Sequence, residues 1–553
     1  MFRNYPGWYP DSDPYTFYPP FKPLVHKWDD FLELIKTEAD KRTKMEMQMF
    51  RRELDPLLKA HFSALAEAKA TGVIAFKALW LILAPGELML CYDSDQMSGL
   101  RLRAANLIPA RLKKPTYWDI TLDQCDWNGS RCDVKLIRKE ITDFAQPILA
   151  TKLSVYPLYF APDHQNIRKA LLARGRQFEN LRGFHVMICT GKKYIEEYTM
   201  QGPREVTKPI SGRVIIDSHA YYACQEKVPL ALRIWGAKTG SGAQRSDRLV
   251  DDDEDTKYKR KEDLKSLSND ECVIANPRVR GFDLKAKEWC EFNVEEIHPP
   301  KWDNKPYEKI VLPPGEKELV AALVQKDRPK ENRFDDFVQH KGEGTIILLC
   351  GPPGVGKTLT VEAMAEKSER PLYVLSASEL GTKPSTVEPA LQSALQCCEL
   401  WNAVLLLDEA DIFLQTRDSS SLERNELVSI FLRALEYYRG LLFLTTNRID
   451  AIDPAFKSRI DLIIPYKDLT KEARREVWVN FISRLSPKVT EFTKDDFNEL
   501  AKAEMNGREI KNTVKTALLL AEQDGVFSMQ HIKTVLGIRK RIMDLDLGHF
   551  TAG

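Results

Sequence analysis

The sequence GPPGVGKT, residues 351–358, decides how this part of the chain folds. The apolar stretch TIILL precedes it at residues 345–349, and TLTVEAMAEKS follows from residue 358 with helical spacing. Glycines between a strand and a helix leave backbone N–H groups free to surround phosphates, and the helix N-terminus adds partial positive charge. The sequence therefore predicts a phosphate-binding loop made of Gly351, Pro352, Pro353, Gly354, Val355, Gly356, Lys357 and Thr358.

Two side chains of this loop have predicted roles in binding a nucleotide and its metal ion. We expect the Lys357 ammonium to contact the β- and γ-phosphates, and the Thr358 hydroxyl to bind Mg²⁺. The sequence AVLLLDEAD, residues 403–411, supplies a second apolar strand that ends in adjacent carboxylates. Asp408 is expected to hold Mg²⁺ through water and Glu409 to polarise the attacking water. The alternative is that the two acids only cap the next helix.

A third apolar stretch, LLFLTTN, ends in Asn447. An asparagine at the end of a strand can orient a lytic water or contact a γ-phosphate, although asparagines are also common in turns. Because the carboxyl ends of parallel strands meet at one edge of a sheet, we expect Asn447 to lie near the loop and the two acids.

These motifs, with the following DPAFKSRID, resemble the AAA family of ATPases within the AAA+ group. The resemblance covers residues 305–545 and includes the Walker A and Walker B motifs. It implies binding of ATP and Mg²⁺, hydrolysis of ATP, and a homo-oligomeric ring, for which six subunits is one option. It also implies that Arg459, in KSRID, reaches the nucleotide of a neighbouring subunit, and that Arg508, in NGREIKN, contacts the nucleotide from a helical lid.

The length of 553 residues predicts several domains, since one hydrophobic core does not grow to this size. We expect a multidomain α/β protein, with an N-terminal α+β domain, a P-loop NTPase core with a parallel sheet, and a C-terminal helical lid. The predicted segments are an irregular arm (1–27), the α+β domain (28–235), a charged linker (236–271), the core with its lead-in (272–465), the lid (466–545) and a tail (546–553). This layout resembles largely fungal proteins that join an uncharacterised N-terminal domain to a single AAA module.

The composition and the N-terminal sequence indicate which partners and which cell compartment to expect. The net charge of +1 gives no general attraction to nucleic acid, and no membrane span or signal peptide is expected. The ten cysteines include no C-x-x-C pair and indicate reduced thiols in an intracellular protein, cytoplasmic or nuclear. Residues 72–91 are expected to form two strands around a turn at Pro85 and Gly86.

Two features depart from the family pattern. The segment ASELGTKPSTVEPAL, after the predicted strand at residues 372–376, has no aromatic residue of the kind that grips a threaded polypeptide. Lys457 and Ser458 stand where a second arginine is often found, so we expect Arg459 to act alone.

The sequence predicts an ATPase that remodels a macromolecular partner bound through residues 28–235. The alternative is a nucleotide-gated binding or scaffold protein with little turnover. The letters DEAD at residues 408–411 prompt a helicase hypothesis. A helicase would need a second RecA-like domain, whereas the chain after residue 465 has the pattern of a helical lid.

Overall fold

The structure is a computed structural model that divides into two compact units, residues 1–300 and 301–553. It describes residues 5, 17–93, 96–110, 114–200, 202–225, 232, 264–312, 314–324, 344–381, 383–416, 422–448, 452–485 and 492–549. Most of the predicted arm and linker lies outside these residues. The described end of the arm contains a short helix, α1 (Lys22–His26), so the expectation of an irregular segment does not hold there.

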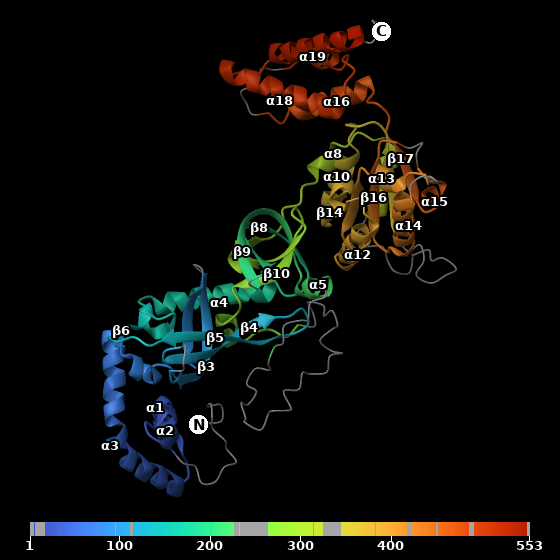
Figure 1. The fold of residues 1–553 in the computed structure, drawn as a ribbon. Helices are drawn as coiled ribbons and strands as arrows, with labels where there is room; N and C mark the ends of the chain where they lie inside the picture. The colour runs from blue at the N-terminus through green and yellow to red at the C-terminus, as the bar shows by residue number, and fades with distance from the viewer. Residues whose placement is uncertain are drawn as a thin grey trace. The chain divides into compact units, whose positions relative to one another are not determined.

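The first unit begins with helices that pack on one another. Helices α2 (Trp28–Thr37) and α3 (Lys41–Thr71) share a buried cluster that includes Trp28, Phe31 and Leu58. The Asp40 carboxylate accepts a hydrogen bond from the Thr43 N–H and so caps the first turn of α3. In Figure 1 these helices form the blue end of the chain.

An antiparallel sheet follows, in the order β5-β4-β3-β2-β7. Its strands are β2 (Leu88–Asp93), β3 (Gln96–Ile108), β4 (Tyr117–Trp127), β5 (Cys132–Thr142) and β7 (Val155–Pro157). The short strands β1 (Val73–Ile74) and β6 (Ile148–Leu149) pair beside it. Three 3₁₀ helices, η1 (Phe76–Leu81), η2 (Ala150–Lys152) and η3 (Leu158–Phe160), and helix α4 (His164–Asn180) complete this part.

The expectation of two strands around Pro85 and Gly86 is correct for the segment after the turn and wrong for most of the segment before it. The strand after the turn, β2, forms, but before the turn only the two residues of β1 are a strand, and they pair with β6; η1 occupies most of the remaining stretch. The buried side chains do not alternate as in a half-buried strand: Phe76, Leu79 and Leu81 are all buried, and the two 3₁₀ turns of η1 bury them as readily as a strand would.

The second sheet of this unit closes on itself. Strands β8 (His185–Thr199), β9 (Gly202–Ile216), β10 (Arg278–Asp283) and β11 (Glu288–Asn293) pair in sequence, and β11 pairs again with β8. Strand β12 (Ile297–His298) adds to β8. Helices α5 (Ser218–Ala223) and α7 (Asn269–Val273) and the 3₁₀ helix η5 (Val294–Glu296) lie between these strands in sequence.

This closure corrects one predicted boundary. We expected residues from 272 onward to lead into the ATPase core, but β10, β11 and β12 pair with β8 and β9 of the first unit. Strand β10 also supplies a cationic partner for a buried acid of the first unit. Arg280 on β10 donates to both carboxylate oxygens of Asp126 on β4, at 3.1 and 3.0 Å. Burial alone would raise the pKa of Asp126, yet the Arg280 charge and hydrogen bonds hold it below its usual range.

The second unit contains a five-stranded parallel sheet in the order β14-β15-β16-β13-β17. The strands are β13 (Thr345–Cys350), β14 (Leu372–Ser376), β15 (Val404–Asp408), β16 (Leu441–Thr446) and β17 (Leu462–Pro465). The central strands β13, β15 and β16 are buried except at Thr345 and Asp408, as expected of a parallel sheet covered on both faces. The predicted parallel-sheet core is therefore confirmed.

Helices surround this sheet, as Figure 1 shows. They are α8 (Lys305–Glu308), α9 (Pro314–Val324), α10 (Lys357–Lys367), α11 (Ala377–Leu380), α12 (Pro384–Leu400), α13 (Asp411–Leu414), α14 (Leu422–Tyr437) and α15 (Pro454–Lys457). The segment without an aromatic residue forms α11 and the start of α12.

The C-terminal lid is helical, as predicted. It consists of α16 (Lys471–Ile482), α17 (Lys494–Leu500), α18 (Gly507–Asp524) and α19 (Met529–His549) around a core that contains Trp478, Ile510 and Ile532. Helix α19 runs past the expected start of the tail at 546. Across the described parts of both units, no helix combines the length and apolar character needed to cross a membrane.

Candidate nucleotide site

Three strands bring the predicted site residues to one edge of the parallel sheet. Cys350, at the end of β13, is paired with Thr446 at the end of β16, and β15 lies on the other side of β16. The phosphate-binding loop, the acids after β15 and Asn447 therefore leave the sheet side by side. This edge is where ligands bind in open α/β sheets.

The loop backbone depends on two of its glycines. Gly351 has a φ of 143°, and a Cβ there would lie 2.2 Å from the Tyr466 carbonyl oxygen. Gly354 has a φ of 78°, and a Cβ there would lie 2.6 Å from Asn506 Oδ1 in the lid. Both positions thus exclude side chains, and helix α10 begins directly afterwards at Lys357.

The Lys357 ammonium lies at the centre of the loop. Its Nζ donates to the carbonyl oxygens of Gly351 and Pro352 and to Asn447 Oδ1, each at 2.7 Å. Burial lowers the pKa of Lys357, while the charges of Asp408 and Asp411 oppose that shift. A buried cation held by neutral oxygens is suited to binding an anion.

Thr358 and Asp408 lie together as expected of residues that bind Mg²⁺. Thr358 Oγ1 is 3.2 and 3.3 Å from the two carboxylate oxygens of Asp408. Mg²⁺ prefers oxygen ligands and usually takes one or two from the protein, the rest coming from phosphates and water. The hydroxyl and carboxylate fit that requirement, and elsewhere in the described chain no group of three or more His, Cys, Asp or Glu could hold a metal ion.

Glu409 follows the strand in a left-handed backbone conformation, with a φ of 55°. Its N–H donates to Thr445 Oγ1 at 3.0 Å, and the Thr445 hydroxyl in turn donates to Asp408 Oδ1. The backbone reversal separates the two adjacent carboxylates. Asp408 stays partly buried beside Thr358, whereas the Glu409 side chain is exposed and lines the cavity.

Asn447 is held by a second carboxylate, from Asp411. Asp411 Oδ1 accepts the Thr446 hydroxyl and, at 3.3 Å, the Asn447 N–H. With its side-chain oxygen bound to Lys357, Asn447 is fixed at both ends, so its amide has a defined position beside the loop.

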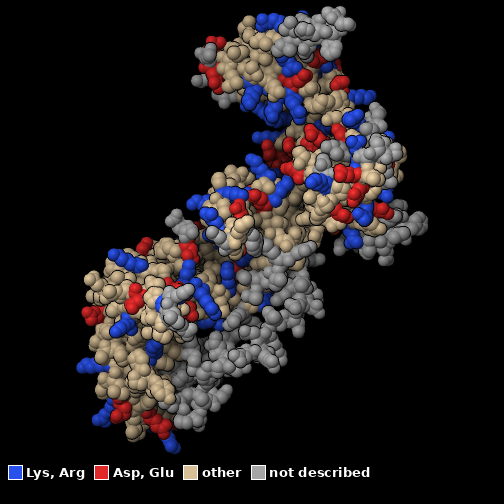
Figure 2. Space-filling model, viewed as in Figure 1, with Lys and Arg blue, Asp and Glu red and all other residues tan. Residues whose placement is uncertain are grey.

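The lid touches the loop directly. The Gly507 N–H, in the first turn of α18, donates to the Gly354 carbonyl oxygen at 2.9 Å. Three lid cations, Arg484, Arg508 and Lys511, line the same cavity as the loop. Over most of the face drawn in Figure 2, basic and acidic side chains are interspersed, and a group of basic side chains gathers on the helical lid.

The cavity has a volume of about 520 Å³, within the usual range for a ligand of nucleotide size. One part is lined by the charged and polar groups described above. Another part is apolar and comes from three segments, through Ile310, Val311, Tyr466, Val477 and Phe481. The cavity can therefore take a molecule with an anionic chain and a flat apolar group.

Arg459 does not line this cavity. Its Nη1 donates to the Ala455 carbonyl oxygen at 2.9 Å, and its Nη2 lies 3.2 Å from Glu436 Oε2 on α14. Within one chain, then, the structure brings together the loop, Asp408, Glu409, Asn447 and Arg508, but leaves Arg459 apart.

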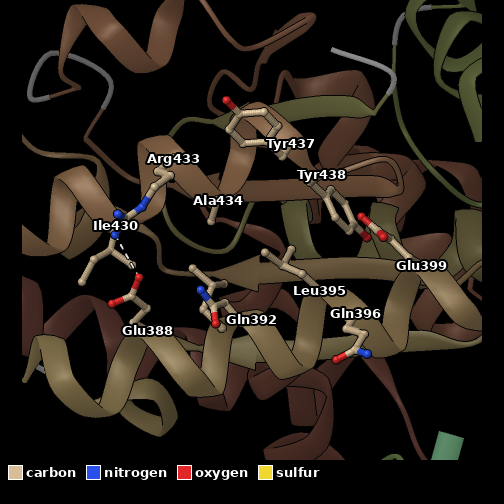
Figure 3. A pocket seen from close by; sticks show the side chains of 11 residues that line it. Glu388, Gln392, Leu395, Gln396, Glu399, Ile430, Arg433, Ala434, Tyr437 and Tyr438 are labelled. Carbon is tan, nitrogen blue, oxygen red and sulfur yellow. Dashed lines mark hydrogen bonds and ion pairs between the residues drawn. The ribbon is translucent and has the colours of Figure 1, made fainter. Parts of the chain in front are cut away.

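A second cavity, of about 300 Å³, lies between α12 and α14 (Figure 3). Arg433 points toward Glu388 across it and forms an ion pair of 2.9 Å. None of the predicted site residues lines this cavity, so it is separate from the nucleotide site.

Several site residues were not predicted from the sequence. Thr445 and Asp411 stood inside recognised motifs, in LLFLTTN and DEAD, but only the geometry shows what they bind. Glu362, one turn after Thr358, and Lys511 also line the cavity. The apolar wall of the cavity, formed by Ile310, Val311, Tyr466, Val477 and Phe481, could not be predicted from the sequence. Isolated apolar residues from distant segments have no distinctive spacing.

Comparison with known families agrees with this geometry. Residues 347–467 match the ATPase family associated with various cellular activities (AAA). The chain contains an AAA domain. Residues 469–541 match the fungal AAA+ ATPase lid domain, and residues 64–162 match a domain of unknown function (DUF7025). The predicted resemblance, to a fungal-type protein with an uncharacterised N-terminal domain and one AAA module, is confirmed.

Curated relatives match over part of this chain. A putative 26S proteasome regulatory subunit homolog of Methanothermobacter thermautotrophicus is 27% identical over 238 residues, which is 40% of this chain and 61% of the relative. The 26S proteasome regulatory subunit 6A of Saccharomyces cerevisiae is 27% identical over 299 residues, 50% of this chain and 64% of the relative. The chain thus spans less than two thirds of both relatives.

An ATP-dependent zinc metalloprotease FtsH of Mycoplasmopsis synoviae is 32% identical over 193 residues, 32% of this chain and 28% of that protein. Among solved structures, a chain of the HORMA:CdnC:Trip13 complex of E. coli MS115-1 covers 43% of this chain and 92% of its own length. It is 18% identical, with a TM-score of 0.35.

Proposed function

We propose that this chain is a Mg²⁺-dependent ATP hydrolase that couples turnover to the remodelling of a macromolecular partner. One observation carries the proposal: Lys357, the Thr358–Asp408 pair, Glu409 and Asn447 converge beside a cavity of nucleotide size. Lys357 binds the β- and γ-phosphates. Thr358 and Asp408 hold the metal ion, which neutralises charge on the phosphates.

The remaining groups act on the attacking water and the γ-phosphate. The exposed Glu409 carboxylate accepts a hydrogen bond from the water and so increases its nucleophilicity. Asn447, fixed by Asp411 and Lys357, orients the water or the γ-phosphate. Arg508 contacts the phosphates from the lid. The apolar wall of Ile310, Tyr466 and Phe481 packs on the adenine ring.

Glu409→Gln tests the hydrolytic role. The amide keeps the size of the side chain but does not accept a proton, so ATP should still bind while turnover falls by about 10²–10⁴-fold. ATP binding is measured by equilibrium dialysis and turnover by phosphate release. Turnover at the wild-type rate would show that Glu409 is not the base.

Arg459 is proposed to complete the site of a neighbouring subunit in a homo-oligomeric ring. Its guanidinium would neutralise charge on the γ-phosphate, a contribution worth about 10³–10⁵-fold in related enzymes. Arg459→Ala should therefore impair turnover without weakening ATP binding. In mixtures with wild-type protein, activity should fall faster than the wild-type fraction, whereas a strictly proportional decrease would contradict the ring.

The N-terminal residues 28–235 are proposed to select the partner. A second function, nucleotide-gated binding with little turnover, is favoured by the segment at α11 and α12, which has no aromatic residue to grip a threaded chain. Light scattering with and without ATP, together with a turnover assay, separates the two functions. A monomer that binds ATP and barely hydrolyses it would favour the second.

A further inference from the structure

The Arg459 guanidinium is turned toward its own subunit. Its two terminal nitrogens are engaged by the Ala455 carbonyl oxygen and the Glu436 carboxylate. Its Nε is buried and has no hydrogen-bond acceptor among the described residues. The Arg459 side chain is only 31% exposed, and that of Glu436 only 23%.

An arginine that acts on another subunit has to present its guanidinium fork outward. Arginine binds phosphate best through two parallel N–H groups. In the described conformation both terminal nitrogens already have acceptors on the same chain. Each terminal nitrogen keeps a second N–H group, but Glu436 holds the Nη2 side of the fork, so a neighbour's phosphate that binds through Nη2 competes with this carboxylate.

We infer that Glu436 is a positioning residue that competes with the neighbouring subunit's nucleotide for Arg459. The inference rests on the proposed function, since it requires Arg459 to act between subunits. In a free subunit Glu436 holds the guanidinium inward. When a neighbour presents a triphosphate, its larger negative charge displaces the carboxylate. Glu436 thus sets how readily assembly activates hydrolysis.

The same helix provides a matched control. Arg433 on α14 forms an ion pair with Glu388 on α12 at 2.9 Å, where the side chains are 66% and 39% exposed. This pair links α14 to its other neighbour and does not involve Arg459. Glu388→Gln therefore removes one acid next to α14 without changing the ion pair between Glu436 and Arg459.

The test measures turnover per subunit as a function of subunit concentration, at saturating Mg²⁺ and ATP. It uses the full chain as wild type, Glu436→Gln, Glu388→Gln, Arg459→Ala and the Glu436→Gln/Arg459→Ala double variant. Removing the competing charge should lower the subunit concentration for half-maximal turnover by about two- to fivefold. Glu388→Gln should leave that concentration unchanged. Because Glu436 acts through Arg459, the Glu436 change should have no effect when Arg459 is alanine.

The outcomes separate this inference from the proposed function. If Arg459→Ala turns over as the wild type does, the intersubunit role is wrong and the inference fails with it. A second outcome overturns only the inference. In it, Arg459→Ala is impaired, but Glu436→Gln leaves the subunit concentration for half-maximal turnover unchanged, as Glu388→Gln does, or raises it. An equal shift from Glu436→Gln in the Arg459→Ala background would also overturn it, since that effect would not depend on Arg459.

Discussion

The Thr445 hydroxyl is the smallest group on which the proposed chemistry depends. One oxygen donates to the Asp408 carboxylate and accepts the Glu409 N–H. It therefore orients the acid proposed to bind the metal ion and the turn that presents the proposed base. The side chain is 2% exposed, so water does not replace it readily.

Thr445→Val removes this hydroxyl and keeps the shape of the side chain. We expect turnover to fall by about 10–100-fold, as for other residues that orient a metal ligand, while ATP affinity changes little. Steady-state phosphate release and ATP dialysis measure the two quantities. Thr445→Ser restores the hydroxyl and should recover most of the turnover. Equal turnover in the valine and serine variants would contradict this role.

Glu362 is a second residue whose effect can be measured, through the dependence of stability on pH. Burial raises the pKa of its carboxyl, the Asp408 charge raises it further, and Lys511 opposes both. Ionised Glu362 is thus less favourable in the folded chain than in the unfolded one. At low pH Glu362 is protonated and does not lower the free energy of unfolding. As pH rises through its folded pKa, the group ionises and the free energy of unfolding decreases.

Glu362→Gln should therefore raise the melting temperature at pH 7.5, and the gain should shrink as pH falls toward about 4.3, the usual pKa of an unfolded glutamate. Thermal unfolding of both proteins, without nucleotide, at several pH values between about 4 and 8 measures the trend. A difference that stays constant over this range would show that ionisation of Glu362 is not the cause.

Among the elements, α18 connects the lid to the phosphate-binding loop. Asn506 Oδ1 caps it by accepting a hydrogen bond from the Glu509 N–H at 2.9 Å, and the Glu509 carboxylate accepts one from the Asn506 N–H. Glu509 also accepts from Arg539 on α19. The helix end that donates to Gly354 is thus fixed by its own cap and by the last helix of the lid.

Asn506→Ala removes the cap and should lower the free energy of unfolding by about 1 kcal/mol. ATP binding should weaken as well, because the Gly507 N–H loses its fixed position against Gly354. Urea unfolding and ATP dialysis measure the two effects. Asn506→Ser keeps a capping oxygen and should retain stability; a serine variant as unstable as the alanine variant would refute the capping explanation.

The elements also show which parts of the fold the sequence predicts. Strands β13, β15 and β16 were predicted almost to the residue, because buried parallel strands are continuous apolar runs beside recognisable motifs. The closing strands β10 to β12 were assigned to the neighbouring domain. Their partners β8 and β9 precede the charged segment, and local patterns carry no information on pairing across so many residues.

In the candidate site, too, the sequence predicts some residues and not the contacts that hold them. The proposed roles of Lys357, Asp408, Glu409 and Asn447 followed from motifs that place them at strand ends. The bonds from Thr445 and Asp411 could not be predicted, because a threonine or aspartate inside a motif has many possible partners. Arg459 was expected from the resemblance, but its contact with Glu436 depends on how α14 and α15 pack.

At the scale of the whole molecule, the strand pairing defines where the chain can be divided. A fragment of residues 1–300 contains all strands of the first unit, whereas residues 1–271 lack β10, β11 and β12. The shorter fragment also loses Arg280, which donates to both oxygens of the Asp126 carboxylate, and leaves this 1% exposed group with only Lys135, 4.0 Å away, as a cationic partner.

We therefore expect residues 1–300 to unfold in a single cooperative transition and residues 1–271 to aggregate or remain partly unfolded. Breaking a buried ion pair by removing one partner alone costs about 3–5 kcal/mol. Circular dichroism on heating and gel filtration compare the fragments. A fragment of residues 1–271 that melts as sharply as residues 1–300 would contradict the importance of these strands.

The order of strands in the closed sheet has a mechanical consequence. The chain leaves the first unit toward the AAA domain immediately after β12, whose two residues, Ile297 and His298, pair with Cys189 and Ile188 of β8. Any tension transmitted along the backbone between the units would load this shortest strand first. Two paired residues resist pulling far less than the fifteen that join β8 to β9. β12 is thus the first element expected to detach under load, a weak point that would yield while the rest of the sheet keeps its pairing.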